Sequence, residues 1–262
     1  MSYGTIIRKR YIMRTSNPTL NSDTFYPTKR GAYIQEFGMT VQGVVLKTGL
    51  LLLLSLLSAG WVWLKFTKGG ADVASLNGWM WGSVIGGFVL ALITTFKKDW
   101  AALTAPLYAL VEGIFIGAIS LVLESSFPGI VMQAATCTFG TLAAMLFVYQ
   151  SGLVRVTDTF RMVIMTATGG IAIAYLIMIA LSFFGVNIGF FTGNSLFSIG
   201  LSLFVIGVAA LNFVLDFDFI ERGAERGAPK YMEWYGAFAL MVTMTWLYIE
   251  FLRLLSKLRS RN

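Results

Sequence analysis

The sequence predicts an all-α integral membrane protein in which seven transmembrane helices form a bundle, with the last helix at its centre. Of its 262 residues, 56% are hydrophobic and only 13% are charged, whereas about a quarter of the residues in a soluble domain are charged. The mean hydropathy is +0.73. No stretch alternates apolar and polar residues as a half-buried strand does. The chain is therefore expected to be helical and embedded in a membrane.

Seven apolar runs are each long enough to cross about 30 Å of hydrocarbon, which takes about 20 helical residues. They cover approximately residues 43–66, 78–96, 100–124, 130–150, 161–184, 195–216 and 234–254. The connections between them are short, so neighbouring helices are predicted to be antiparallel. The pairs Gly82-xxx-Gly86 and Gly113-xxx-Gly117 predict close contacts between helices, because glycine lets two backbones approach.

Residues 1–40 differ from the rest of the chain because they are polar and basic, and Pro18 and Pro27 interrupt any helix there. This segment is predicted to be a mobile basic N-terminal tail, and residues 41–262 the transmembrane domain. The segment does not have the pattern of a secretory signal peptide, since the first apolar run begins only near Val41.

Lysine and arginine predict the orientation. Most of the 20 basic residues lie in the tail and in the second, fourth and sixth connections, which places the N-terminus in the cytoplasm. The net charge of +7 fits loop orientation and contact with anionic lipid rather than nucleic acid. Of the other six, Lys65 and Lys68 lie at the first connection, and four lie near the C-terminus: Arg253, Lys257, Arg259 and Arg261. If the chain has seven full spans, these C-terminal residues lie outside the cell, which conflicts with the positive-inside rule. The alternative is a last segment that enters the membrane and returns to the same side.

Several chemistries are excluded by composition. The chain has no histidine, so imidazole bases and histidine metal sites are ruled out. The single cysteine, Cys137, lies in an apolar run and is interpreted as a small core residue. The motifs HExxH and GxSxG and a phosphate-binding loop are missing from the sequence. We therefore expect neither an enzyme nor a bound cofactor.

Four acidic residues lie in the spans or at their edges: Glu112, Asp216, Asp218 and Glu250. A carboxylate at such a depth costs a few kcal/mol unless it is hydrated, protonated or paired. Glu112 is the deepest, and is either a proton or cation ligand or a neutral acid bonded to a neighbouring helix. Glu250 stands one helical turn before Arg253, which favours a local ion pair.

Asp216 and Asp218 follow one of the most apolar runs of the chain. They either mark the end of the helix in the headgroup region or have a function within the bundle. Two residues apart on a helix, they point about 200° apart, so only one of them is expected to face the interior. The charged stretch 221–230 that follows is interpreted as a solvated turn.

Five stretches carry a resemblance to a known family: Phe213–Asp216, Leu252–Leu255, Asn17–Leu20, Ala105–Gly113 and Ala228–Tyr235. Together with seven spans, they resemble the Bax inhibitor-1 (transmembrane Bax inhibitor motif) family, and within it the bacterial YccA-type members. The resemblance implies a passive, pH-sensitive calcium leak in the bacterial inner membrane. It also implies an alternative, in which the protein does not conduct and modulates a membrane-bound ATP-dependent protease.

The resemblance further implies a latch in which an aspartate on the sixth helix and one on the seventh share a proton. Asp216 matches the first position, with Asp218 close to it, but the second position is Thr243. Glu112 could replace the missing acid. If the seventh helix begins near Trp234, Thr243 lies about 14 Å deep, within reach of Asp216 directly or through one water.

Two hypotheses of different classes remain. In a calcium leak, Glu112 and Asp216 are possible weak calcium ligands, and Asn212 and Thr243 add further oxygens, since calcium prefers several oxygen ligands and conduction needs weak binding. In a non-conducting partner protein, the tail and the charged stretch 221–230 bind the protease. The hypotheses differ in whether Glu112 and Asp216 meet a common wet cavity.

Overall fold

The computed structural model of the chain describes residues 38–68, 73–185, 193 and 195–261. The tail predicted over residues 1–40 therefore lies, up to residue 37, outside the described residues. The described helices are α2 (Val41–Lys68), α3 (Val73–Phe96), the short η1 (Lys98–Trp100), α4 (Ala101–Ser126), α5 (Ile130–Gln150), α6 (Asp158–Phe183), α8 (Leu196–Glu225) and α9 (Met232–Arg259). Seven of these are long and apolar enough to cross a membrane, which confirms the predicted all-α multi-pass architecture.

The sixth span ends later than predicted. Helix α8 continues past residue 216 to Glu225, so the two aspartates lie inside the helix rather than at its end. The stop is set by Gly227, at φ 65°. The Gly227 N–H donates to Ala224 O, and the Ala228 N–H donates to Gly223 O. These two hydrogen bonds are those of a Schellman motif. The stretch interpreted as a turn is thus helical in its first half.

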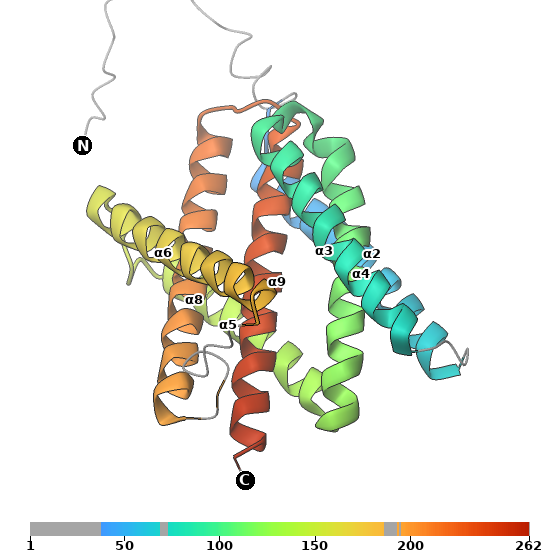
Figure 1. Cartoon of the computed structure of the whole chain (residues 1–262). Helices are drawn as coiled ribbons and strands as arrows, with labels where there is room; N and C mark the ends of the chain where they lie inside the picture. Colours follow the sequence, from blue (N-terminus) through green and yellow to red (C-terminus); the bar gives the residue numbers. More distant parts are fainter. Residues whose placement is uncertain (1–37, 69–72, 186–192, 194, 262) are drawn as a thin grey trace, which may run out of the picture. The chain divides into compact units, whose positions relative to one another are not determined.

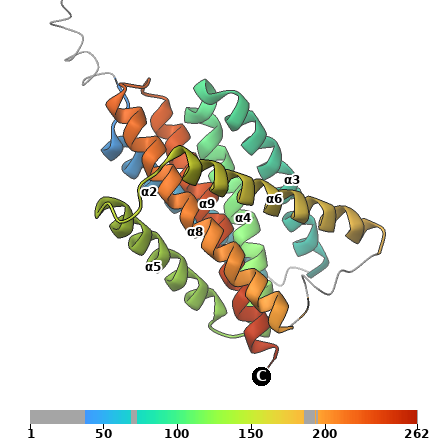
Figure 2. The same ribbon diagram turned by 90° about the vertical axis from the view of Figure 1, so that its left-hand side faces the viewer.

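Helix α9 lies in the middle of the bundle, as predicted for the last helix (Figure 1). It contacts α2, α4, α5 and α8. In α9, 56% of the spanning window is buried, against 11% in α6. Helix α6 packs on α8 and runs obliquely across it in both views (Figures 1 and 2). The bundle is therefore organised around α9, with α6 at its periphery.

The second glycine pair makes the predicted close contact. A Cβ placed on Gly117 would lie 2.8 Å from the Cα of Ala59 in α2, and one on Gly113 would overlap the backbone of Ser55. Helices α2 and α4 thus touch backbone to backbone. The first pair does not: a Cβ on Gly82 would meet nothing within 4 Å, and one on Gly86 only makes ordinary contact with Val111. Glycine spacing alone does not distinguish the two cases.

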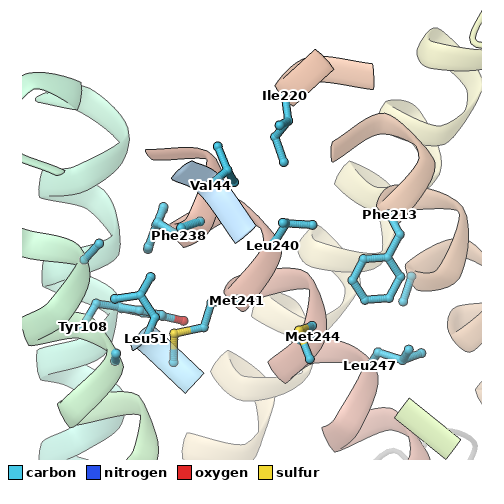
Figure 3. Close-up of a cluster of buried hydrophobic side chains, with 14 of the residues drawn as sticks. Val44, Leu51, Tyr108, Phe213, Ile220, Phe238, Leu240, Met241, Met244 and Leu247 are labelled. Atoms are coloured by element: carbon cyan, nitrogen blue, oxygen red, sulfur yellow. The ribbon is translucent and has the colours of Figure 1, made fainter. Parts of the chain in front are cut away.

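The core is formed around α9 by apolar side chains from several helices (Figure 3). Met241 and Leu247 of α9 are fully buried, and so is Phe213 of α8. Tyr108 of α4 meets Phe238 of α9 edge to face, with ring centroids 5.0 Å apart. Since lipid tails are as apolar as these residues, tight packing and polar contacts between helices provide the association energy.

One buried acid anchors the start of α9. The Glu233 side chain is fully buried and accepts hydrogen bonds from the backbone N–H (2.9 Å) and the hydroxyl (2.8 Å) of Thr40. It also forms ion pairs with Lys47 of α2 and with Lys230, the latter at 2.8 Å. A side chain at Gly43 would overlap its carboxylate. Glu233 therefore joins α9 to the beginning of α2, a role that the sequence analysis did not assign to it.

Candidate functional site

Asp216 and Thr243 join the two central helices. The Thr243 hydroxyl donates to Asp216 Oδ2 at 2.7 Å. Asp216 is half-buried and Thr243 is buried. At 1.5 Å per residue, Asp216 lies about 14 Å before the end of α8 and Thr243 about 17 Å after the start of α9, so the antiparallel helices bring them to one level. The predicted proximity of the two side chains is confirmed, with a direct bond.

Asp218 faces a different helix. Its carboxylate accepts from Arg161 of α6 and from Arg222, one turn further along α8, each at 2.9 Å. The side chain is buried, and two cations compensate its charge. This pairing explains why α8 can continue past Asp218 without ending at the headgroups. The two aspartates point to α9 and α6 respectively, as the angle of about 200° between them predicts. Both contact a neighbouring helix, so the expectation that only one of them faces the interior was wrong.

Asn212 also bridges α8 and α6. Its Nδ2 donates to Thr168 Oγ1 of α6 and to Val208 O of its own helix, both at 2.8 Å. Asn212 and Asp216 are one turn apart on α8, so their side chains lie near each other on the helix surface. The polar surface of α8 therefore runs from Asn212 to Asp216 between the two neighbouring helices.

Glu112 lies on the other side of the bundle. Its Oε2 would be 3.3 Å from a Cβ placed on Gly87, so the carboxyl rests on α3. Tyr108, one turn earlier on α4, is its polar neighbour on the helix surface. Among the described residues Glu112 forms no hydrogen bond with Asp216, Asn212 or Thr243. The structure does not bring Glu112 into the group of oxygens around Asp216.

Glu250 is buried and forms a three-residue cluster. Arg253 Nη1 donates to Glu250 Oε1 at 3.1 Å, which confirms the predicted local pair. Tyr175 of α6 donates to the same oxygen at 2.6 Å and accepts from Arg253 Nη1, also at 2.6 Å. Tyr175 was not predicted. Its part in the cluster depends on α6 crossing α9, which spacing in the sequence does not reveal.

The polar contacts of α6 come from residues seven apart: Arg161, Thr168 and Tyr175. A spacing of seven returns to one face of a helix after two turns. This spacing is visible in the sequence and was missed, although it links α6 to three of the five polar residues singled out on α8 and α9. Because little of α6 is buried, these bonds are its principal polar attachments to the bundle.

Among the cavities between the described helices are three of about 320, 330 and 410 Å³. Neither Glu112 nor Asp216 lines any of these three, so none of them is the common cavity that the calcium-leak hypothesis expects. In this conformation Asp216 contacts Thr243 rather than one of these cavities. The described residues also contain no group of three or more acidic or cysteine side chains arranged to hold a metal ion. The oxygens around Asp216 therefore offer only a few ligands for a metal ion in this conformation.

Comparison with known protein families finds a match over most of the chain. A sequence model of the family described as Bax inhibitor 1 like matches residues 17–260. No curated protein and no solved structure matches the chain. The match extends over nearly the whole chain, including all seven spans and the Asp216–Thr243 contact. The chain belongs to the Bax inhibitor 1 like family of multi-pass membrane proteins.

Proposed function

We propose that the protein is a pH-sensitive calcium leak channel of the bacterial cytoplasmic membrane, with its N-terminus in the cytoplasm and calcium as the transported ion. A leak of this kind fits the family in general. The observation that carries the proposal is the hydrogen bond between Asp216 and Thr243, which joins the central helix to α8 at the level of the predicted latch. The basic residues support a cytoplasmic N-terminus, because most of them lie in the tail and in the connections predicted on the same side as the tail.

Protonation of Asp216 is the proposed pH-dependent step. A charged Asp216 accepts from the Thr243 hydroxyl, as in the described contact. A neutral Asp216 carries its own O–H and can donate instead, but it no longer attracts a cation. Asp218 is the nearest other acid in the sequence, and its charge is already compensated by Arg161 and Arg222. One titrating group then replaces a coupled pair of aspartates, so the response follows one proton rather than two macroscopic steps.

Calcium passage needs oxygen ligands that bind weakly. Asp216, Thr243 and Asn212 provide carboxylate, hydroxyl and amide oxygens on adjoining surfaces of α8 and α9. Glu112, against α3, provides a separate carboxylate in α4. We assign the first group to the pH-sensitive position and Glu112 to a second weak position on the pathway. Two separated weak positions suit conduction better than one tight cage.

The test is calcium flux into liposomes that contain the purified protein. We expect flux to depend on pH with a slope near one, Asp216→Asn to flatten this dependence, and Thr243→Asp to steepen it by restoring a pair of acids. Glu112→Gln should lower flux at every pH. Asp99→Asn, in the exposed η1 segment, is the matched control and should behave like the wild type.

Normal flux and a normal pH response in both Asp216→Asn and Glu112→Gln would remove these residues from the pathway. An absence of flux in the wild-type protein at every pH would contradict the channel itself. That second result would favour the non-conducting alternative, in which the protein modulates a membrane-bound ATP-dependent protease.

A further inference from the structure

A cavity of about 320 Å³ lies between α4, α6, α8 and α9, within the size range of ligand pockets. It is near the end of the bundle where α4 and α9 finish and α8 begins (Figure 1). We propose that this cavity binds the phosphate group of an anionic phospholipid. The proposal concerns a region separate from the Asp216–Thr243 contact and does not depend on the leak function.

Lys257 is the first reason. The residue is only 5% exposed, yet its Nζ contacts neutral oxygens, Ser202 Oγ at 2.9 Å and Ser198 O at 3.3 Å. None of the ion pairs in the described part of the chain includes Lys257. An ammonium group has three donors, so one remains beyond these two contacts. A buried charge is costly unless it is paired, and an anion in the cavity would pair it.

Arg253 is the second reason. It lines the same cavity one turn before Lys257 on α9. Its hydrogen bonds to Glu250 and Tyr175 use Nη1, and its guanidinium lies over the Tyr175 ring, 4.8 Å from the centroid. Nε and Nη2 donate no hydrogen bond to another described residue. Two cations and the single carboxylate of Glu250 leave the cluster with one excess positive charge. A guanidinium and an ammonium one turn apart match the oxygens of a phosphate group.

The other wall of the cavity indicates a lipid rather than a free ion. Phe127, which follows the end of α4, lines it together with Met178 of α6 and Leu201 of α8. Little of α6 is buried, and Ile179, the residue after Met178 in the sequence, is 49% exposed. The cavity thus has cations on one side and an apolar wall on the other, near the ends of membrane-spanning helices. A phospholipid has the same arrangement, with a phosphate at the membrane surface and acyl chains below it.

Three of the four basic residues that conflict with the positive-inside rule have contacts at this end of the bundle. Arg253 and Lys257 line the cavity, and Arg259 donates to Pro128 O at 2.7 Å and to Gln133 Oε1 at 2.9 Å. Each of these three therefore has a partner or a place in the cavity wall at this end of the bundle. Positive charge on this side is tolerated because it serves packing and ligand binding.

The test is native mass spectrometry of the full-length protein in detergent, titrated with phosphatidylglycerol, phosphatidylcholine or inorganic phosphate. We expect phosphatidylglycerol to remain bound and to protect the protein against heat. Phosphatidylcholine and inorganic phosphate should do so far less. Lys257→Met keeps the volume of the side chain and should weaken phosphatidylglycerol binding about tenfold or more. Lys65→Gln, a lysine near the end of α2 that stacks on Trp61 and does not line the cavity, is the matched control.

A second variant, Leu201→Trp, fills the apolar wall and keeps both cations, and it should also weaken phosphatidylglycerol binding. Equal binding of phosphatidylcholine and phosphatidylglycerol to the wild type would overturn the proposal, since the charge would not be recognised. Protection by inorganic phosphate equal to that by phosphatidylglycerol would overturn the assignment to a lipid. An effect of Lys65→Gln as large as that of Lys257→Met would overturn the location. If both cavity variants fail to fold, the binding of the three ligands to the wild-type protein still tests the proposal.

Discussion

Replacing Thr243 by valine removes the hydroxyl that donates to Asp216 and leaves a side chain of nearly the same shape. Combined with Asp216→Asn, it forms a double-mutant cycle that measures how strongly the two residues interact. A hydrogen bond to a charged group contributes about 1.5–3 kcal/mol, and interhelical hydrogen bonds in a membrane average about 0.6 kcal/mol with a maximum near 1.7. The bond is 2.7 Å long and Thr243 is 7% exposed. We therefore expect a coupling energy of about 1–2 kcal/mol.

The assay is the free energy of unfolding of the four proteins, from titration of detergent-solubilised protein with a denaturing detergent. A matched cycle pairs Asp216→Asn with Thr48→Val. Thr48 is another buried threonine, but its hydroxyl donates to Val44 O of its own helix at 2.9 Å. The control cycle should be additive within about 0.5 kcal/mol. A coupling energy between Asp216 and Thr243 as small as that of the control would refute the view that their bond holds α8 and α9 together.

Three further predictions concern packing, topology and the tail. Gly113→Ala should lower the melting temperature by several degrees, because overpacking costs about 1–3 kcal/mol. Gly140→Ala is the control and should leave the melting temperature unchanged, because a Cβ there meets nothing within 4 Å. Equal effects of the two variants would contradict the close α2–α4 contact. Cys137 is exposed rather than the core residue that was predicted, so it is replaced by serine for the topology test. In intact cells, a cysteine replacing the exposed Ser260 should then react with an impermeant thiol reagent, whereas labelling only after lysis would favour a re-entrant last segment. Deleting residues 1–37 should leave a monodisperse protein in gel filtration, since this polar segment has little apolar sequence to pack; aggregation would count against a dispensable tail.

Much of the fold follows from the sequence because the bilayer imposes it. A helix must have about 20 apolar residues to cross the hydrocarbon, and its backbone groups must be satisfied internally. The seven runs therefore appear as seven helices, with most ends displaced by only a few residues. The exception is α8, which runs on to Glu225. Hydropathy located its apolar part, while the actual end depends on Gly227 and on the ion pairs of Asp218.

The candidate site was predictable where the partners are close in sequence or joined by a short turn. The Glu250–Arg253 pair lies within one helical turn, and Asp216 and Thr243 lie on two helices joined by residues 226–231. In both cases helix geometry alone limits where the side chains can be. The position of Glu112 was not predictable in this way, since its neighbour across the interface is Gly87, whose lack of a side chain leaves no signal of its own.

The sequence by itself determined the class, the number of spans and the acids that require a partner, because apolar length and the cost of a buried charge are local properties. Only the tertiary structure decided which partner each acid has. Arg161 reaches Asp218 across 57 residues, and Tyr175 reaches Glu250 across 75. Both contacts depend on the oblique path of α6 over α8 and α9, and the packing of one helix on another sets that path.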